Sequence, residues 1–297
     1  MLFRSQILSP YCRHEPRTLA PYVAIRSSLA VLTRRVFRWP ESTAPNAVAP
    51  SVDSSLGAKL LPGVLSIIAG SVDVICFLGL GGLFAAHITG NLVVLAAHIA
   101  TGRATALAPI LSVPVFIASL GLTRLLAVGL RETRHGTLRP LLGLQLALLV
   151  SFLAVLIAAG SGLDPAAPIA VVAGMLGVAA MAVQNALVQI SMGGAPATAV
   201  MTTDITKFMM DVVVMLFRLD SSEVAHARSR ASHTWPAIVG FTIGCSLGAV
   251  LEAAIGYWSL ALPTGLGLLA LALGFTIKRR LPAQRALGSL RPDSLTS

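Results

Sequence analysis

Long apolar runs separated by short polar connections fill the chain from Lys59 to about residue 280. Each run is close to the ~20 residues that a helix needs to cross the hydrocarbon core of a bilayer. The pattern predicts helical segments at about 60–82, 84–100, 106–129, 140–160, 167–191, 197–217, 236–257 and 259–277. We therefore expect an all-α polytopic membrane protein with six to eight hydrophobic helical segments.

One stretch, from Gly70 to Asn91, departs from this simple pattern. It reads GSVDVICFLGLGGLFAAHITGN, so that Asp73 lies inside an apolar run and the glycine pair at 81–82 interrupts it. A carboxylate at membrane depth is costly, and non-helical backbone there is tolerated only where protein or a cavity satisfies it. The stretch therefore predicts a broken helix with a functional role.

Composition agrees with a membrane location. Hydrophobic residues make up 55% of the chain and charged residues only 11%, which is too little charge to cover the surface of a soluble core of this length. The net charge of +10 comes from the tails and connections, without a basic run interleaved with aromatic residues. The charge therefore favours contact with anionic lipid headgroups and indicates no nucleic-acid partner. The three cysteines have no metal-binding spacing.

Three regions follow from the distribution of apolar and polar residues. Residues 1–58 are rich in Arg and Pro and contain no run long enough to span, so we expect a disordered, dispensable tail; a targeting segment and translation from upstream of the natural start are the alternatives. The transmembrane domain covers 59–280, with one repeat at about 60–160 and a second at about 167–278. Residues 281–297 form a short C-terminal tail.

Arginine clusters predict the topology. They lie before Leu60, within 124–139, within 218–230 and after Phe275. If all eight segments crossed, the second cluster would face outside, although basic connections prefer the cytoplasm. If the first pair of segments and the pair 167–217 each make one net crossing, all four clusters are cytoplasmic. We therefore expect six net crossings and both termini in the cytoplasm.

The two halves of the transmembrane domain resemble each other. Aligning Thr89 with Thr202 pairs Asn91 with Asp204, and the second half has its own glycine pair at 193–194. With three crossings each, the halves are inverted repeats with interrupted helices, the architecture of many secondary transporters. With four crossings each, the repeats would be parallel, which transporters also use.

The residues also carry a resemblance to a known family. The run VDVICFLGLGGLFAAHITGN, the tripeptide Gln184-Asn185-Ala186 and the threonine-rich segment 201–204 resemble the YoaK-like family of small bacterial inner-membrane proteins. The resemblance covers roughly residues 60–280. It implies a compact multi-helix protein of the bacterial plasma membrane, and it implies no activity. The long N-terminal tail, Asp204 and Lys207 depart from the usual pattern of this family.

Polar residues at the broken helices are the candidate ligands. In the first half, Asp73 is either a proton or cation carrier or a buried, hydrogen-bonded carboxyl. His87, which shares a helical face with Asn91 and His98, either relays protons or only lines a helix contact. Thr89, Gly90 and Asn91 open a helix, which they either cap or offer to an anionic group.

In the second half, Asp204, Lys207 and Asp211 share one helical face, and the lysine can pair with both carboxylates, either as a structural ion cluster or as part of a central site. The amides of Gln184 and Asn185 add donors and acceptors or only join helices. The candidate substrate- or ion-binding residues are Asp73, His87, Thr89, Gly90, Asn91, Gln184, Asn185, Thr202, Asp204, Lys207 and Asp211.

We expect a small-solute secondary transporter, coupled to protons or another ion, with its site near the midplane. The chain has no catalytic motif, metal cluster or nucleotide fingerprint, so we expect no catalytic residues, metal or cofactor. A membrane-embedded structural or regulatory subunit is the main alternative, and an intramembrane enzyme is the third. The expected partners are the bilayer and a small solute or ion; a homo-oligomer is left open.

Overall fold

The structure is a computed structural model of the chain. It describes residues 56–101, 107–130, 136–160, 162–192, 201–217 and 221–277, all of which belong to one compact unit, Pro50–Ser297. The predicted tails lie outside the described residues, except that 56–58 begin the first helix. The second predicted glycine pair, at 193–194, also lies outside them.

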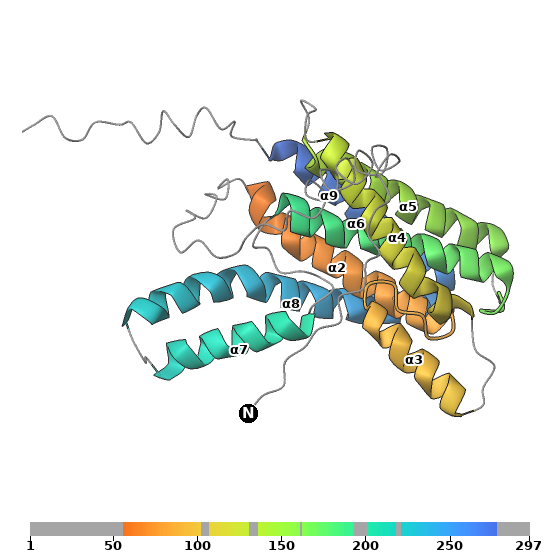
Figure 1. Cartoon of the computed structure of the whole chain (residues 1–297), viewed down its shortest axis with the longest axis horizontal. Helices are drawn as coiled ribbons and strands as arrows, with labels where there is room; N and C mark the ends of the chain where they lie inside the picture. Colours follow the sequence, from red (N-terminus) through yellow and green to blue (C-terminus); the bar gives the residue numbers. More distant parts are fainter. Residues whose placement is uncertain are drawn as a thin grey trace, which may run out of the picture. The chain divides into compact units, whose positions relative to one another are not determined.

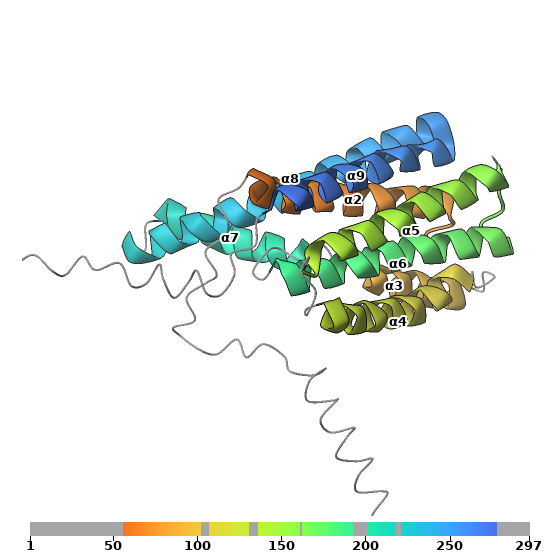
Figure 2. The ribbon, with the colours of Figure 1, turned by 90° about the horizontal axis from the view of Figure 1, so that it is seen from above.

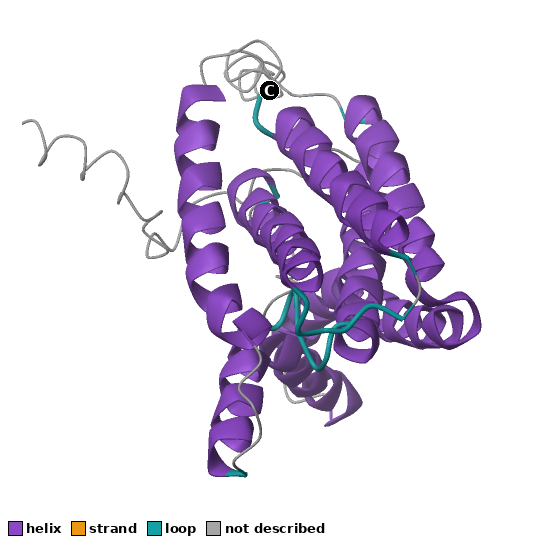
Figure 3. Ribbon diagram, turned by 90° about the vertical axis from the view of Figure 1, so that its right-hand side faces the viewer, coloured by secondary structure: helices purple, strands orange, loops and turns teal. Residues whose placement is uncertain are grey.

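Every predicted apolar segment corresponds to one α-helix (Figure 1). The helices are α2 (Leu56–Gly79), α3 (Ile88–Ala100), α4 (Leu107–Leu130), α5 (Leu138–Ala159), α6 (Pro168–Ser191), α7 (Met201–Phe217), α8 (Ser221–Ile255) and α9 (Ala261–Thr276), with the 3-10 helix η2 (Gly256–Leu260) between the last two. The rest of the described residues form short loops, and no strand occurs among them (Figure 3). The predicted all-α fold is confirmed.

The start of α5 meets the ends of α6 and α9. Arg139 donates hydrogen bonds to the carbonyls of Gly274 and Phe275, at 3.2 and 3.3 Å, so a cation satisfies the last free carbonyls of α9. Thr137 and Ser191 join hydroxyls at 3.0 Å between the start of α5 and the end of α6. The start of α5 and the ends of α6 and α9 therefore lie at the same end of the bundle.

Contacts of the α2 C-terminus define the opposite end of the bundle. The Tyr257 hydroxyl donates to the carbonyl of Gly79 at 3.3 Å, which places η2 beside this terminus. A Cβ on Gly81 would lie 3.0 Å from Pro165, in the connection between α5 and α6. The ribbon shows helix directions that agree with these contacts: α2, α5 and α8 run in one direction, and α4, α6 and α9 run in the other (Figure 2).

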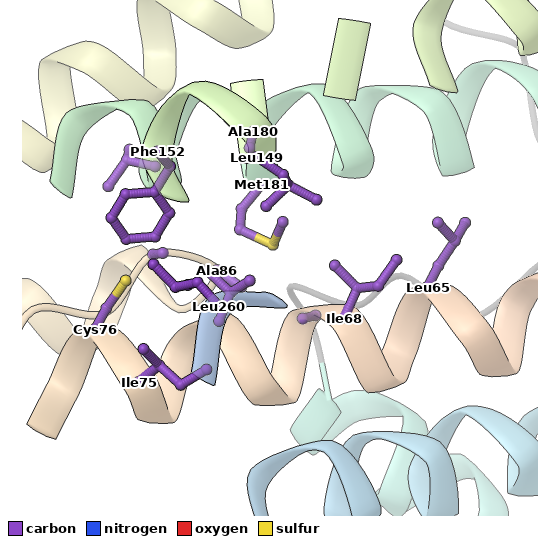
Figure 4. Close-up of a cluster of buried hydrophobic side chains, with 14 of the residues drawn as sticks. Leu65, Ile68, Ile75, Cys76, Ala86, Leu149, Phe152, Ala180, Met181 and Leu260 are labelled. Carbon is purple, nitrogen blue, oxygen red and sulfur yellow. The ribbon is translucent and has the colours of Figure 1, made fainter. Parts of the chain in front are cut away.

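The apolar core lies between α2, α5, α6 and η2. Leu65 and Ile68 of α2 point toward the layer that carries Phe152 of α5 and Met181 of α6, and Ile75 lies on the side of Leu260 of η2 (Figure 4). All of these side chains are at most 1% exposed. In contrast, many large apolar side chains of α3, α4 and α7 are exposed. Such an outward apolar surface is unusual for a protein surrounded by water and ordinary for one surrounded by lipid.

Five stretches of the described residues are long and apolar enough to cross a membrane. They are Gly57–Gly79, Leu107–Leu130, Leu138–Ala159, Pro168–Ser191 and Glu223–Thr276. The last stretch contains α8, η2 and α9, and α9 runs back antiparallel to α8 (Figure 2). The helix α3 is apolar but shorter, and α7 is not among the spans. The fold therefore defines a polytopic helical membrane protein.

The helix α8 is longer than its predicted apolar segment, because it begins at Ser221 instead of near residue 236. Its first half is polar on the outside, but Ala227, Ala231 and Ala237 are buried on one side. The helix α7 packs on α8, and Asp211 of α7 pairs with Arg230 in this half. The apolar pattern predicted the spanning half and missed the polar half, whose inward side consists of alanine.

The direction of the helices gives a topology prediction. Reporter fusions are expected to place residues 136 and 226 on the cytoplasmic side and residue 164 outside, because the first two lie at the arginine-rich end of the bundle. Fusions to a cytoplasmic-active and a periplasm-active reporter at each position make the measurement. A cytoplasmic signal at 164 together with an external signal at 136 would exclude six crossings with cytoplasmic termini.

Candidate functional site

Asp73 joins α2 to the connection that follows it. The side chain lies six residues before the end of α2, and the residue is 4% exposed. Its Oδ1 accepts a hydrogen bond from the backbone N–H of Ala86 at 2.6 Å, and its Oδ2 contacts Nδ1 of His87. Both carboxylate oxygens therefore have partners in the segment 80–87, so Asp73 joins this segment to α2.

His87 is the titratable partner of Asp73. It lies directly before α3, outside the spans, and its side chain is 26% exposed. The hydrogen bond that the His87 ring donates to the Asp73 carboxylate raises the pKa of His87, and burial partly opposes the rise. The ring also packs edge-on against Phe241 of α8, with 5.2 Å between centroids. The pair can thus hold and release a proton where the connection meets α8.

Two glycines shape the break between α2 and α3. Gly81 and Gly82 have φ angles of 68° and 86°, in the left-handed region that residues with a Cβ rarely adopt. The backbone therefore reverses direction within a few residues and returns Ala86 and His87 to the level of Asp73. The glycine pair in the sequence correctly predicted this interruption.

Asn91 fixes the other side of the break. Its residue is fully buried, and its Oδ1 accepts from the N–H of Phe84 at 2.8 Å. Its Nδ2 donates to the Phe84 carbonyl at 2.7 Å and to Oγ of Ser112 on α4 at 2.8 Å. All of these partners lie outside α3.

The predicted capping role of Thr89, Gly90 and Asn91 is therefore wrong. His87 occupies the N-cap position, and no side chain caps the helix. The Thr89 residue is exposed, and Gly90 lies against the Phe84 ring, 2.8 Å from where a Cβ would be. Asn91 ties the connection to α4 instead of closing the first turn.

The amides of α6 lie between helices. Gln184 is fully buried; it donates to the Leu65 carbonyl of α2 at 2.9 Å and accepts from Nε2 of Gln145 of α5 at 2.7 Å. Asn185 is next in the chain and 5% exposed. Gln184 thus joins three helices, which is one of the two roles expected for these amides.

The charged residues of α7 are arranged differently from the prediction. Asp211 is 5% exposed and pairs with Arg230 of α8, whose Nε lies 3.0 and 3.3 Å from the two carboxylate oxygens. Lys207 is exposed, and no ion pair between described residues includes it. Asp204 is 7% exposed, and Thr202 is exposed. The expected lysine bridge between two aspartates is wrong, because the longer α8 brings its own arginine to Asp211.

Apart from the amides of α6, the candidate residues form two separate groups. Asp73, His87 and Asn91 surround the connection 80–87, whereas the charged residues of α7 lie along α8. The helix α3 packs on α4, and α7 packs on α8. Within the described part of the chain, no hydrogen bond or ion pair joins the two groups.

Sequence reasoning missed Ser112 and Gln145, which complete the networks of Asn91 and Gln184. Ser112 lies two residues before Pro114 inside α4, and it also donates to the carbonyl of Pro109 at 2.7 Å. A polar residue beside an internal helix proline was the available signal, because proline frees a carbonyl of the preceding turn. Gln145 had no such signal.

These observations define the class: a polytopic helical membrane protein in which a buried carboxylate contacts a partly exposed imidazole at a broken helix. The chain belongs to the family described as Protein of unknown function (DUF1275), whose model matches residues 61–273. The predicted membership in an uncharacterised family over roughly residues 60–280 is thereby confirmed. No curated protein matches the chain, and no solved structure matches it.

Proposed function

We propose that the protein is a small-solute secondary transporter of the bacterial plasma membrane, coupled to protons or another cation. The observation that carries this proposal is the contact between Asp73 and His87. A carboxylate in a membrane helix faces a titratable side chain across an interrupted backbone. Ionisable residues inside membrane helices are costly and typically belong to ion or proton pathways.

The packing of the helices supports two structural repeats. Suppose that α2 exchanges with α6, α3 with α7, α4 with α8, and α5 with α9. The pair α2–α8 then becomes α6–α4, α2–α9 becomes α6–α5, and α3–α4 becomes α7–α8, while α5–α9 and α2–α6 map onto themselves; all of these pairs are in contact. Because α2 and α6 run in opposite directions (Figure 2), the relation is that of inverted repeats.

Inverted repeats suggest how the site would work. In transporters of this architecture, one repeat moves against the other around a solute site formed by interrupted helices. Here the hydrogen bonds that side chains make to the connection 80–87 come chiefly from Asp73 and Asn91, while Leu83, Ala85 and Ala86 of the connection are buried in the core. A proton on His87 strengthens its contact with the Asp73 carboxylate, and loss of that proton weakens it. Proton transfer at this pair would therefore bias the position of the connection.

A second candidate is a structural or regulatory subunit without transport activity. The observation that favours it is that both oxygens of Asp73 already have partners within the chain. A purely structural role requires nothing more than these two contacts of the Asp73 carboxylate. The two candidates differ in their response to small molecules.

The proposal predicts that a small solute stabilises the purified protein. A ligand that binds only the native state raises the apparent stability by RT ln(1 + [L]/Kd), which is about 2.7 kcal/mol at a hundredfold excess over Kd. Thermal unfolding of the detergent-solubilised protein against a solute library, at acidic and neutral pH, makes the measurement. A stabilising solute whose effect depends on pH is expected; no stabilising solute at any pH would favour the structural subunit.

A further inference from the structure

Asp204, in the second half of the chain, is a buried carboxylate with one oxygen that lacks a hydrogen-bond partner among the described residues. Its residue is 7% exposed, and its Oδ2 is buried without a hydrogen-bond partner among the described residues. Burial raises the pKa of Asp204, and the charge of Lys207 lowers it. An ionised carboxylate left in this position would lose its hydration without compensation, whereas a protonated one has a hydrogen to donate.

The antiparallel helices α7 and α8 form a hairpin, and its ion pair indicates which residues of α8 lie opposite Asp204. Asp211 of α7 contacts Arg230 of α8, which sets the register of these two antiparallel helices. Asp204 lies seven residues before Asp211, and Thr234 lies four residues after Arg230. At ~1.5 Å per residue, both are displaced from the ion pair in the same direction, by about one to two helical turns. Along the helix axis, Thr234 is thus the hydroxyl-bearing residue of α8 closest to the level of Asp204.

The first half contains the completed form of this arrangement. Asn91, the counterpart of Asp204, donates to Ser112, and the Ser112 hydroxyl donates in turn to a carbonyl one turn earlier. Ser112 lies two residues before Pro114, and Thr234 lies two residues before Pro236. The Thr234 hydroxyl also donates to a carbonyl one turn earlier, that of Arg230 at 3.1 Å. Its oxygen lone pairs therefore remain able to accept a hydrogen bond.

We propose that Asp204 is a proton-binding residue whose protonated carboxyl donates a hydrogen bond to the Thr234 hydroxyl and fastens α7 to α8. A protonated carboxyl resembles the amide of Asn91, since each is neutral and carries a donor hydrogen. The ionised carboxylate has no hydrogen to donate, so deprotonation releases this contact. The inference rests on the repeats of the proposed function, and it assigns the second proton site to the hairpin of the second half.

No other charged group described on α7 or α8 is placed to contact Thr234 in the way proposed for Asp204. On α7, Asp211 is already paired with Arg230, and Lys207 is exposed. On α8, Glu223, His226 and Arg228 lie on the far side of the ion pair from Thr234, and His233 is exposed, with Nδ1 at 2.6 Å from the Ser229 carbonyl. A response that Asp204→Asn removes is therefore assigned to one carboxyl group.

Distances between spin labels on the two helices test the proposal. The exposed residues Thr206 of α7 and Val239 of α8 are replaced by labelled cysteines in the full chain, after removal of Cys12, Cys76 and Cys245. Double electron–electron resonance spectroscopy in lipid nanodiscs then gives the distribution of distances between the two labels as the pH is lowered. We expect a broad distribution at neutral pH and a narrower, shorter one in acid. Asp204→Asn should give the narrow distribution at every pH, and Thr234→Val should abolish the narrowing.

Asp211→Asn is the matched control, because it makes the same chemical change on the same face of α7. It should broaden the distribution at every pH and leave the acid-induced narrowing in place. A distribution that does not change with pH in the otherwise native chain, or one that still narrows with pH after Asp204→Asn, overturns the proposal. The measurement requires no solute. A failed solute screen therefore counts against the proposed transport, whereas a failed pH response counts against Asp204.

Discussion

Replacing Gly244 with valine is expected to prevent the protein from forming its native bundle. A Cβ at this position would overlap the Ile67 carbonyl oxygen and lie 2.9 Å from the carbonyl carbon and Cα of the same residue. All three atoms are backbone, so no side-chain rotation relieves the overlap. Glycine at this crossing lets α2 and α8 approach closely, as small residues do in membrane helix pairs.

The cost should be large because both helices are fixed elsewhere. Gly70 of α2 lies against the backbone of Cys245, so an outward shift of α8 at Gly244 would also disturb this contact. Overpacking in a close-packed interior costs roughly 1–3 kcal/mol, and more where the backbone has to move. Gly244→Ala should therefore lower the unfolding temperature, and Gly244→Val should give aggregated protein in size-exclusion chromatography.

Gly121→Val is the matched control. Gly121 lies inside α4, and an added Cβ meets nothing within 4 Å. This variant should elute and unfold like the natural chain, within the small effect of helix propensity. Equal damage from both substitutions would mean that valine in any membrane helix is harmful, and that the close approach of α2 to α8 is not the cause.

The fold was predictable from the sequence because hydropathy acts locally. Each apolar run of about the thickness of a bilayer forms a helix, and the glycine pair at 81–82 marks the interruption. The polar half of α8 was not predictable in this way. Its buried side chains include Ala227 and Ala231, and alanine contributes too little hydrophobicity to mark a buried face.

The candidate site was predictable only in part, because residue types can be read from a sequence and partners cannot. Asp73 was conspicuous as the one carboxylate within its apolar run, and His87 followed the break. Their contact depends on a left-handed turn whose path no spacing rule gives. In the second half, spacing on one helix suggested Lys207 as the partner of Asp211, but the partner is Arg230 on another helix. Long-range pairing of this kind is decided by packing.

Asp73→Asn is expected to preserve the fold and abolish accumulation of solute against its gradient. The asparagine Oδ1 can still accept from the N–H of Ala86, which Asp73 now binds at 2.6 Å. Its Nδ2 can donate to Nδ1 of His87 in the neutral tautomer, so the connection stays in place. The substitution removes the negative charge that favours a proton on His87. Transport in proteoliposomes with an imposed pH gradient is expected to fall to equilibration of the solute across the membrane.

The pH dependence of stability checks the same pair without a known solute. Because the pKa of His87 is raised in the folded protein, this contact contributes stability at low pH and loses it as the pH rises above the ordinary value of 6.5. The unfolding temperature of the natural chain should therefore decline as the pH rises above about 6.5, and Asp73→Asn should remove this part of the decline. This window lies above the acidic range in which an aspartate such as Asp204 ordinarily titrates.

Asp73→Leu and Asp164→Asn separate transport from structure. Leucine leaves the buried N–H of Ala86 without its acceptor, which costs roughly 1–3 kcal/mol and should lower the unfolding temperature at every pH. Asp164 is exposed and accepts a local hydrogen bond from Ala166, so its substitution should change neither transport nor the pH profile. If Asp73→Asn matches the natural chain in transport and in pH profile while Asp73→Leu is unstable, the carboxylate is only a brace. The broken helix would then hold the bundle together without coupling a proton to a solute.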